Sequence, residues 1–131
     1  MTNALAQGGI WTNVFTTGLK LATGRERPDQ EDNLSFPSGH TANMFNIAVI
    51  VGHYYGKKVE IPLYIFAAFV GWSRVDENAH YLSDVVAGAG LGYLVGKAVI
   101  RANQPRNESQ RLTWVPILGR KAIGVRFSLL L

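Results

Sequence analysis

The sequence predicts a mainly α-helical fold, in which a bundle of helices is followed by a small β addition at the C-terminal end. Apolar residues recur at helical spacing over most of residues 4–101. Short segments rich in glycine, proline and polar residues interrupt them, and an alternating apolar pattern appears only near the end of the chain. The 131 residues, 47% of them hydrophobic, suffice for one domain with its own core.

The first predicted helix covers residues 4–23 and is moderately amphipathic, and a glycine and a proline stop it. Residues 24–37 are polar and turn-rich, so they form a predicted loop. Ser38 is a good N-cap residue, and Pro37 keeps the residue before it out of the helical conformation. We therefore expect a second helix from Ser38 to about residue 55, where a glycine and two lysines end it.

The third predicted helix covers residues 61–72, with Pro62 in its first turn, where proline is tolerated. A polar loop follows at residues 73–79. The last helix is expected at about residues 80–101. It contains glycines at four-residue spacing, which share one face and allow another helix to approach closely. These glycines are Gly88, Gly92 and Gly96.

The pattern changes after residue 102. Residues 103–111 form a predicted linker, and residues 112–131 contain an alternation of period two that predicts a strand. A turn at residues 119–121 would pair this strand with the preceding segment in a hairpin. We therefore expect a helical domain over residues 1–102 and a linker with a C-terminal β-hairpin tail over residues 103–131.

Composition limits the classes of partner. The net charge of +4 favours anionic partners, which include phosphate groups, acidic lipids and nucleic acid. No cysteine is present, so disulfides and thiolate–metal sites are excluded. No uninterrupted apolar stretch reaches the roughly 20 residues of a typical membrane span, although residues 85–100 come close to it.

Lys20, Arg25, Arg27 and Pro28 form the first of three clusters of chemically active residues. Lys20 and Arg27 are separated by six residues, so a continuous helix would present both on one face. Cations at the end of a helix also interact favourably with the helix dipole and are often simply solvated. This cluster alone therefore leaves both an anion site and a basic surface open.

The second cluster is Pro37-Ser38-Gly39-His40, at the start of an apolar helix. The free N–H groups of a helix N-terminus bind anions, and Gly39 allows a close approach of the backbone. His40, in the first turn, would face the same anion. An ordinary serine cap beside a surface histidine would give the same pattern.

The third cluster is Ser73-Arg74 followed by His80 and Asp84. If His80 and Asp84 share a helix, their spacing of four lets the carboxylate reach the imidazole. A carboxylate that fixes one ring nitrogen leaves the other free as a nucleophile or base. A pair that merely satisfies its own hydrogen bonds is the alternative.

Together the clusters supply fixed cations, backbone amides, two histidines and a carboxylate, which is what phosphoryl transfer requires. The spacing Lys20-x6-Arg27-Pro28, Pro37-Ser38-Gly39-His40 and Ser73-Arg74-x5-His80-x3-Asp84 resembles the three-part signature of the type 2 phosphatidic acid phosphatase superfamily. This superfamily includes lipid phosphatases, bacterial class A acid phosphatases and vanadium haloperoxidases. Every signature position is filled in order, and the match covers about residues 20–101.

The resemblance implies a role for each matching residue. The phosphate-binding residues would be Lys20, Arg27, Ser38, Gly39 and Arg74. His80 would attack phosphorus to form a phosphohistidine, Asp84 would orient it, and His40 would protonate the leaving oxygen. No metal and no other cofactor are implied. The slow spontaneous hydrolysis of phosphate monoesters, which calls for accelerations of up to about 10²¹-fold, explains why a covalent route with several cations is useful.

The resemblance also implies a helical bundle of the phosphatidic acid phosphatase/haloperoxidase type. Family members usually have further helices before the first signature, whereas few residues precede Lys20 here. We therefore expect a bundle truncated at its N-terminus, completed by upstream helices or by a partner such as a second copy in a homo-oligomer.

The leading hypothesis is a phosphatase acting on lipid-linked phosphate monoesters or diphosphates, membrane-associated or periplasmic in a bacterial cell envelope. A soluble acid phosphatase of broad specificity, acting on small phosphate esters, is the alternative within the enzymes. A vanadium haloperoxidase is disfavoured by size. A vestigial, non-catalytic lipid-binding membrane module is the alternative outside the enzymes. Nucleic acid is not an expected partner, since the cations converge on one site and no aromatic and basic array appears.

Overall fold

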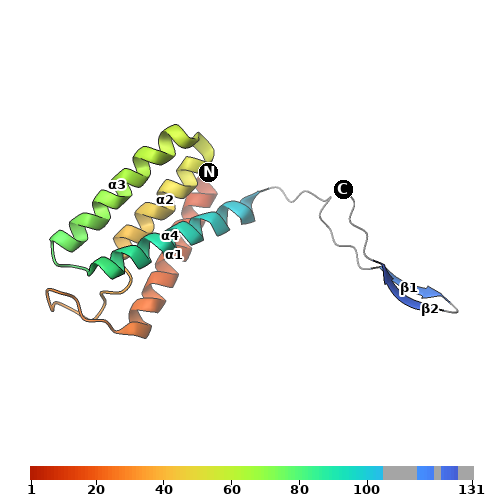
Figure 1. Ribbon diagram of the computed structural model, residues 1–131, viewed down its shortest axis with the longest axis horizontal. Helices are drawn as coiled ribbons and strands as arrows, with labels where there is room; N and C mark the ends of the chain where they lie inside the picture. The colour runs from red at the N-terminus through yellow and green to blue at the C-terminus, as the bar shows by residue number, and fades with distance from the viewer. Residues whose placement is uncertain (105–114, 120–121, 127–131) are drawn as a thin grey trace.

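The computed structural model describes residues 1–104, 115–119 and 122–126, with side chains considered only in the first of these ranges. Four helices make up this first range (Figure 1). They are α1 (Thr2–Thr23), α2 (Gly39–Tyr55), α3 (Lys57–Asp76) and α4 (Leu82–Asn103). The predicted mainly helical fold is therefore confirmed for the described residues.

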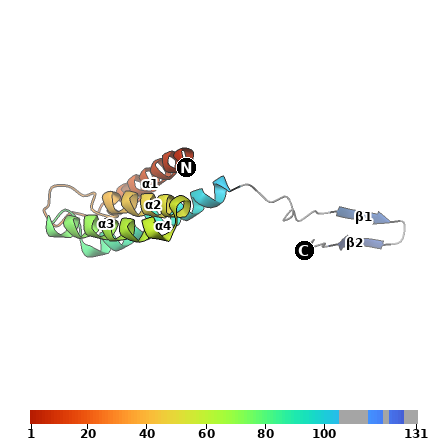
Figure 2. The same ribbon diagram turned by 90° about the horizontal axis from the view of Figure 1, so that it is seen from above.

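Helix α2 is the centre of the bundle. It packs against α1, α3 and α4, and α4 also packs against α1 (Figures 1 and 2). The two connections that carry the chemically active residues, α1–α2 and α3–α4, lie at the same end of the bundle (Figure 1). The fold thus brings the three sequence clusters to one end.

The glycines of α4 allow its close contact with α2, as their spacing predicts. A Cβ atom at Gly88 would collide with the backbone carbonyl of Ser38, and one at Gly92 with that of Ala42. At Gly96 a Cβ atom would lie 2.9 Å from a methyl group of Val49. Because carbonyl groups of the backbone occupy this space, side chains at Gly88 and Gly92 would force the two helices apart.

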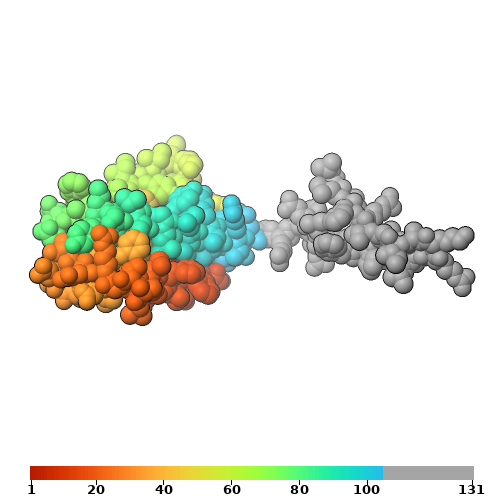
Figure 3. Space-filling view, turned by 60° about the horizontal axis from the view of Figure 1, so that its bottom comes forward, coloured from red at the N-terminus to blue at the C-terminus, as the bar shows by residue number. Residues whose placement is uncertain are grey.

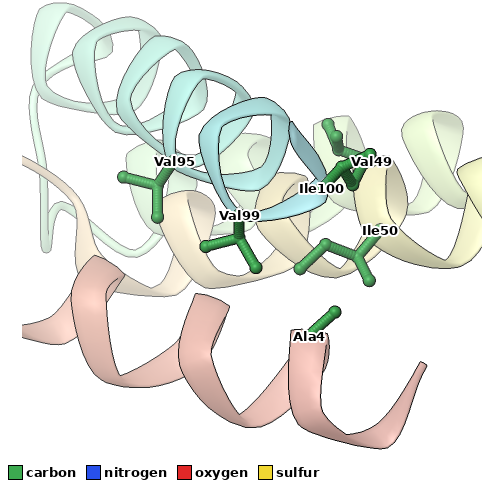
Figure 4. Packing of buried hydrophobic residues seen from close by; sticks show 6 residues of the cluster. All are labelled: Ala4, Val49, Ile50, Val95, Val99 and Ile100. Carbon is green, nitrogen blue, oxygen red and sulfur yellow. The ribbon is translucent and has the colours of Figure 1, made fainter. Parts of the chain in front are cut away.

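The apolar core lies at the other end of the bundle. Valine, isoleucine and alanine side chains from three helices pack together there, as Figure 4 shows. They are Ala4 of α1, Val49 and Ile50 of α2, and Val95, Val99 and Ile100 of α4. Burying each of the larger side chains contributes about 1.5–3 kcal/mol. The site end is instead rich in buried polar residues, among them Ser35, Thr41 and Asp84.

Helix α3 is longer than the sequence predicts. The expectation was residues 61–72 with a loop to residue 79, but α3 runs from Lys57 to Asp76. It begins early because Gly56, with φ of 86°, reverses the chain directly after α2. It ends late because Ser73 and Arg74, which are half-buried, continue the helix, and the N–H of Glu77 bonds to the Ser73 carbonyl. Pro62 consequently lies inside the helix and not in its first turn.

Helix α4 begins later than predicted. It starts at Leu82, so His80 lies in the turn before the helix and is not its first residue. The Asp84 carboxylate accepts a hydrogen bond from the backbone N–H of Tyr81 at 3.0 Å, and this contact caps the helix at that point. His80 and Asp84 therefore do not share a helical face.

Two short strands are described after the bundle. They are β1 (Val115–Gly119) and β2 (Ala122–Arg126), paired antiparallel with Val115 opposite Arg126. Residues 105–114, 120–121 and 127–131 lie outside the described residues, and they include residues 105–111 of the predicted linker and residues 120–121 of the predicted turn. The C-terminal hairpin tail and the division into residues 1–102 and 103–131 therefore stay predictions.

Candidate functional site

One pocket at the site end collects most of the predicted site residues. Its volume is about 390 Å³. Five of the eight predicted residues line it, from α1, α2 and the two connections; they are Lys20, Arg27, Gly39, His40 and His80. Figure 3 shows the orange residues after α1 lying against the green residues at the end of α3 and the start of α4. The remaining lining residues are Asn13, Thr16, Thr17, Asn43, Met44 and Val70.

Lys20 and Arg27 supply positive charge to the pocket. Lys20, in the last turn of α1, donates a hydrogen bond to the carbonyl oxygen of Leu34. The Nε atom of Arg27 lies 2.8 Å from a carboxylate oxygen of Asp32, an ion-pair distance without the alignment of a hydrogen bond. Burial, and then the neighbouring charge of Arg27, lower the pKa of Lys20. The two side chains therefore give the pocket positive charge, and each also contacts an oxygen atom in the α1–α2 connection.

The start of α2 adds backbone donors to the pocket. Ser38 occupies the N-cap position, as predicted, and it is fully buried. Its hydroxyl lies 3.0 Å from the hydroxyl of Thr41 instead of bonding to a backbone amide. No acceptor among the described residues takes the N–H groups of Gly39, His40 and Thr41. This end of α2 therefore keeps the donors with which a helix N-terminus binds an anion.

His80 lies in the turn between α3 and α4, with 4% of its side chain exposed. Its backbone N–H bonds to the carbonyl of Arg74 at 3.1 Å, which fixes the turn. Burial lowers the pKa of His80, and the charge of Lys20 lowers it further, while the Ser35 carbonyl and Asp84 act in the opposite direction. The neutral imidazole is thus the favoured form, and a neutral imidazole is the nucleophilic one.

Asp84 is fully buried, and its carboxylate lies farther from His80 than the hydrogen bond that the sequence predicts. Its Oδ2 atom lies 4.0 Å from His80 Nδ1, beyond hydrogen-bond distance. Nδ1 has no hydrogen-bond partner among the described residues. The carboxylate instead contacts Arg25 at 2.6 Å and Ser35 at 2.5 Å. The Asp84 backbone carbonyl also accepts the N–H of Ser38 at 3.0 Å, which joins the second and third clusters.

Arg74 lies outside the pocket lining. Its guanidinium pairs with Glu77 at 3.0 Å, three residues along the chain. It is nevertheless one turn from Val70, which does line the pocket, so the two residues share a side of α3. Ser38 and Asp84 are fully buried beside lining residues, Ser38 next to Gly39 in the chain and Asp84 4.0 Å from His80. The structure thus gathers five predicted residues directly and places the other three next to them.

Two residues that contact Asp84 were not predicted as part of the site. Arg25 was noted only as one of a run of basic residues, which is usually solvated. Spacing offered no signal that separated Arg25 from the other basic residues of this non-helical segment. Ser35 carried no recognisable signal. The polar pocket residues of α1 and α2, such as Asn13 and Asn43, were also missed.

Within residues 1–104 and the described strands, no group of three or more histidine, aspartate or glutamate residues is placed to hold a metal ion. The fold and the pocket together define a helical-bundle protein with a pocket at one end that is lined by Lys20, Arg27 and two histidines. A family comparison agrees with this description. The chain belongs to the PAP2 superfamily, whose family model matches residues 3–108.

Several curated proteins are similar to this chain. A lipid A 1-phosphatase of Porphyromonas gingivalis is 42% identical over 81 residues, which cover 60% of this chain and 18% of that protein. Lipid phosphate phosphatase 1 of Arabidopsis thaliana is 31% identical over 157 residues, covering 88% of this chain and 48% of the relative. Phosphatidylglycerophosphatase B of Bacillus subtilis is 33% identical over 92 residues, which cover 59% of this chain and 45% of that protein.

The chain spans less than half the length of each of these three relatives. No solved structure matches it.

Proposed function

We propose that this chain carries the active site of a metal-independent phosphatase that cleaves lipid-linked phosphate monoesters or diphosphates through a phosphohistidine. The observation that carries the proposal is the position of His80. It is buried, which lowers its pKa and favours the neutral imidazole, and it lines one pocket with Lys20, Arg27 and His40. The names of the relatives, all phosphatases of lipid phosphates, support the same reaction class.

The pocket supports a two-step reaction. Lys20, Arg27 and the amide of Gly39 bind the phosphate oxygens and stabilise the charge that develops on them. Nδ1 of His80 is the nitrogen nearer Asp84, so Nε2 attacks phosphorus. The new P–N bond forms as the P–O bond to the alcohol breaks, and His40 gives the leaving oxygen its proton.

In the second step the roles reverse. His40, now neutral, takes a proton from water, whose oxygen attacks phosphorus. The P–N bond breaks, inorganic phosphate leaves, and His80 returns to its neutral form. Arg74 joins the phosphate-binding residues when its guanidinium exchanges Glu77 for a substrate oxygen. Ser38 contributes by fixing the start of α2, since its N–H and hydroxyl are both already bonded.

The surface of the bundle supports a lipid-linked substrate and a location at a bacterial envelope membrane. Large apolar side chains at helical spacing lie exposed along α3, with Ile65, Phe69 and Trp72 each more than 60% exposed. A similar row on α1 includes Trp11 and Phe15. Among the described residues, α4 alone has the length and apolar composition that would allow a helix to cross a membrane. Exposed apolar rows of this size are typical of surfaces that meet lipid or other apolar partners.

A soluble phosphate ester is the second candidate substrate. The α1 and α2 side of the pocket is lined by hydrogen-bonding side chains, which suit a hydrophilic leaving group. These are Asn13, Thr16, Thr17 and Asn43. Met44 and Val70 provide apolar lining and favour an apolar leaving group.

Phosphate release from detergent-solubilised protein in the presence of EDTA tests the proposal. One substrate is a water-soluble monoester, and the other is a polyprenyl or diacylglycerol phosphate. The variants are His80→Ala and, as a matched control, His53→Ala, which removes an exposed histidine near the end of α2. We expect release that resists EDTA, survives His53→Ala and disappears in His80→Ala.

Each outcome of this assay has a definite meaning. Preference for the lipid phosphate supports the leading substrate, and preference for the soluble ester supports the alternative. Substantial activity in His80→Ala contradicts the assignment of the nucleophile. Loss of activity with EDTA contradicts the metal-independent reaction.

A further inference from the structure

Arg25 holds a charged group of the site without lining the pocket. Its Nη1 atom lies 2.6 Å from Oδ1 of Asp84 and 2.8 Å from the hydroxyl of Ser83. The guanidinium also stacks on Tyr81, with its central carbon 4.3 Å from the ring centroid. Three contacts at one end fix this arginine, although 39% of its side chain is exposed.

The other carboxylate oxygen of Asp84 is equally occupied. Oδ2 accepts hydrogen bonds from the Ser35 hydroxyl at 2.5 Å and from the Tyr81 backbone N–H at 3.0 Å. With both oxygens bonded, the carboxylate cannot turn toward His80 without breaking one of these contacts. This explains why His80 Nδ1, 4.0 Å away, remains without a partner among the described residues.

We infer that Arg25 is a positioning residue of this site, which balances the charge of Asp84 and holds its carboxylate back from His80. The inference rests on the proposed role of His80 as the nucleophile. A nucleophilic histidine must reach its neutral form, and an unbalanced carboxylate next to it would favour the protonated form. Arg25, assisted by Ser35, keeps the Asp84 carboxylate 4.0 Å from the ring and limits this effect.

The other charged groups around His80 define how strong the effect of Arg25 can be. Lys20 on α1 and Arg27 in the α1–α2 connection both disfavour the imidazolium, and Asp84 on α4 favours it. His40 at the start of α2 lines the same pocket. The side chain that α3 offers nearby, Arg74, is paired with Glu77. Removing Arg25 therefore changes the electrostatic environment of the His80 imidazole mainly through the Asp84 carboxylate.

Imidazole titration by NMR of histidine-labelled protein tests this inference. The variant Arg25→Gln removes the charge, Arg25→Lys keeps it, and Arg101→Gln removes an exposed arginine at the far end of α4 as a matched control. The signal of His80 is assigned by its absence in His80→Ala. We expect Arg25→Gln to raise the titration midpoint of His80 by about 0.5–1 pH unit. Arg25→Lys should recover at least half of that shift, and Arg101→Gln should cause none.

The titration decides the inference whether or not the protein releases phosphate. If the His80 midpoint in Arg25→Gln equals that of the wild type or of Arg101→Gln, the inference is wrong. Should Arg25→Gln fail to fold, Ser35→Ala is used, because it frees the Oδ2 atom of Asp84. A rise in the His80 titration midpoint then supports the inference, and an unchanged midpoint contradicts it. In an active enzyme the acid limb of the kcat/KM profile moves by the same amount, whereas a purely structural role would lower activity equally at every pH. An inactive wild type contradicts the proposed function alone.

Discussion

The Lys20 ammonium and the His80 imidazole line one pocket, although one lies at the end of the first helix and the other in the turn before the last. The positive charge of Lys20 is, after burial, the largest influence that lowers the pKa of His80. In the proposed reaction the same ammonium binds a phosphate oxygen. Lys20 would thus both attract the substrate and keep the nucleophile in the form that attacks.

The lowered pKa of His80 sets the pH dependence of the reaction. Attack requires the neutral imidazole, so the rate rises as the pH increases through this pKa, which lies below the ordinary value of 6.5. We therefore expect kcat/KM, measured from pH 4 to 9, to show an acid limb with its midpoint below that ordinary value. The absence of such a limb contradicts the assignment of His80 as the group that must be neutral.

Lys20→Met tests the contribution of the pocket cation. We expect a decrease in kcat/KM of about 10²–10³-fold, since the ammonium stabilises charge that develops in the transition state. Inhibition by inorganic phosphate should weaken as well. Lys58→Met, which removes an exposed lysine at the start of α3, serves as the control and should retain full activity. Equal activities of the two variants would remove Lys20 from the site.

Asp84→Asn separates catalysis from phosphate binding. The amide retains the shape of the side chain but loses the charge that pairs with Arg25, so we expect the free energy of unfolding to fall by about 2–3 kcal/mol. Turnover should decrease about 10–100-fold because the ring of His80 is less well oriented. Phosphate affinity, measured by calorimetry, should change by less than about threefold. Complete loss of phosphate binding would instead place Asp84 among the phosphate-binding residues.

Gly92→Ala tests the contact between α2 and α4. The added methyl group would meet the backbone of Ala42, which has no room to move, so we expect a loss of about 1–3 kcal/mol in the free energy of unfolding. Gly90→Ala is the matched control, because its Cβ atom would have nothing within 4 Å. That control should be stabilised by about 0.5–1 kcal/mol through helix propensity. Denaturant unfolding of both variants measures the difference, and similar stabilities would contradict the close packing.

The sequence was sufficient to predict the helical class, the bounds of α2 and the packing face of α4, because these depend on local signals. Ser38 and the glycines acted through backbone geometry that any fold would respect. The extent of α3 was not predictable in the same way. Its last turn is polar, and solvent-facing polar residues resemble a loop until the packing of the rest of the helix is known.

The sequence indicated which residues would lie together, while their contacts depended on the fold. Lys20, His40 and His80 line one pocket, and the chemical roles assigned to them stay predictions. The partner of Asp84 was not predictable from spacing, because the start of α4 at Leu82 moved His80 off the helix. Arg25, which is distant in the chain, contacts the carboxylate instead. Whether Asp84 contacts His80 or Arg25 depends on tertiary geometry, which local sequence patterns do not report.

The close contact of Gly88 with the Ser38 carbonyl has a mechanical consequence. At Gly88 no side chain separates α4 from the backbone of Ser38, so no rotamer change at that position can alter the separation. In the proposed phosphatase this contact would hold the amides at the start of α2 at a constant spacing from the turn that carries His80.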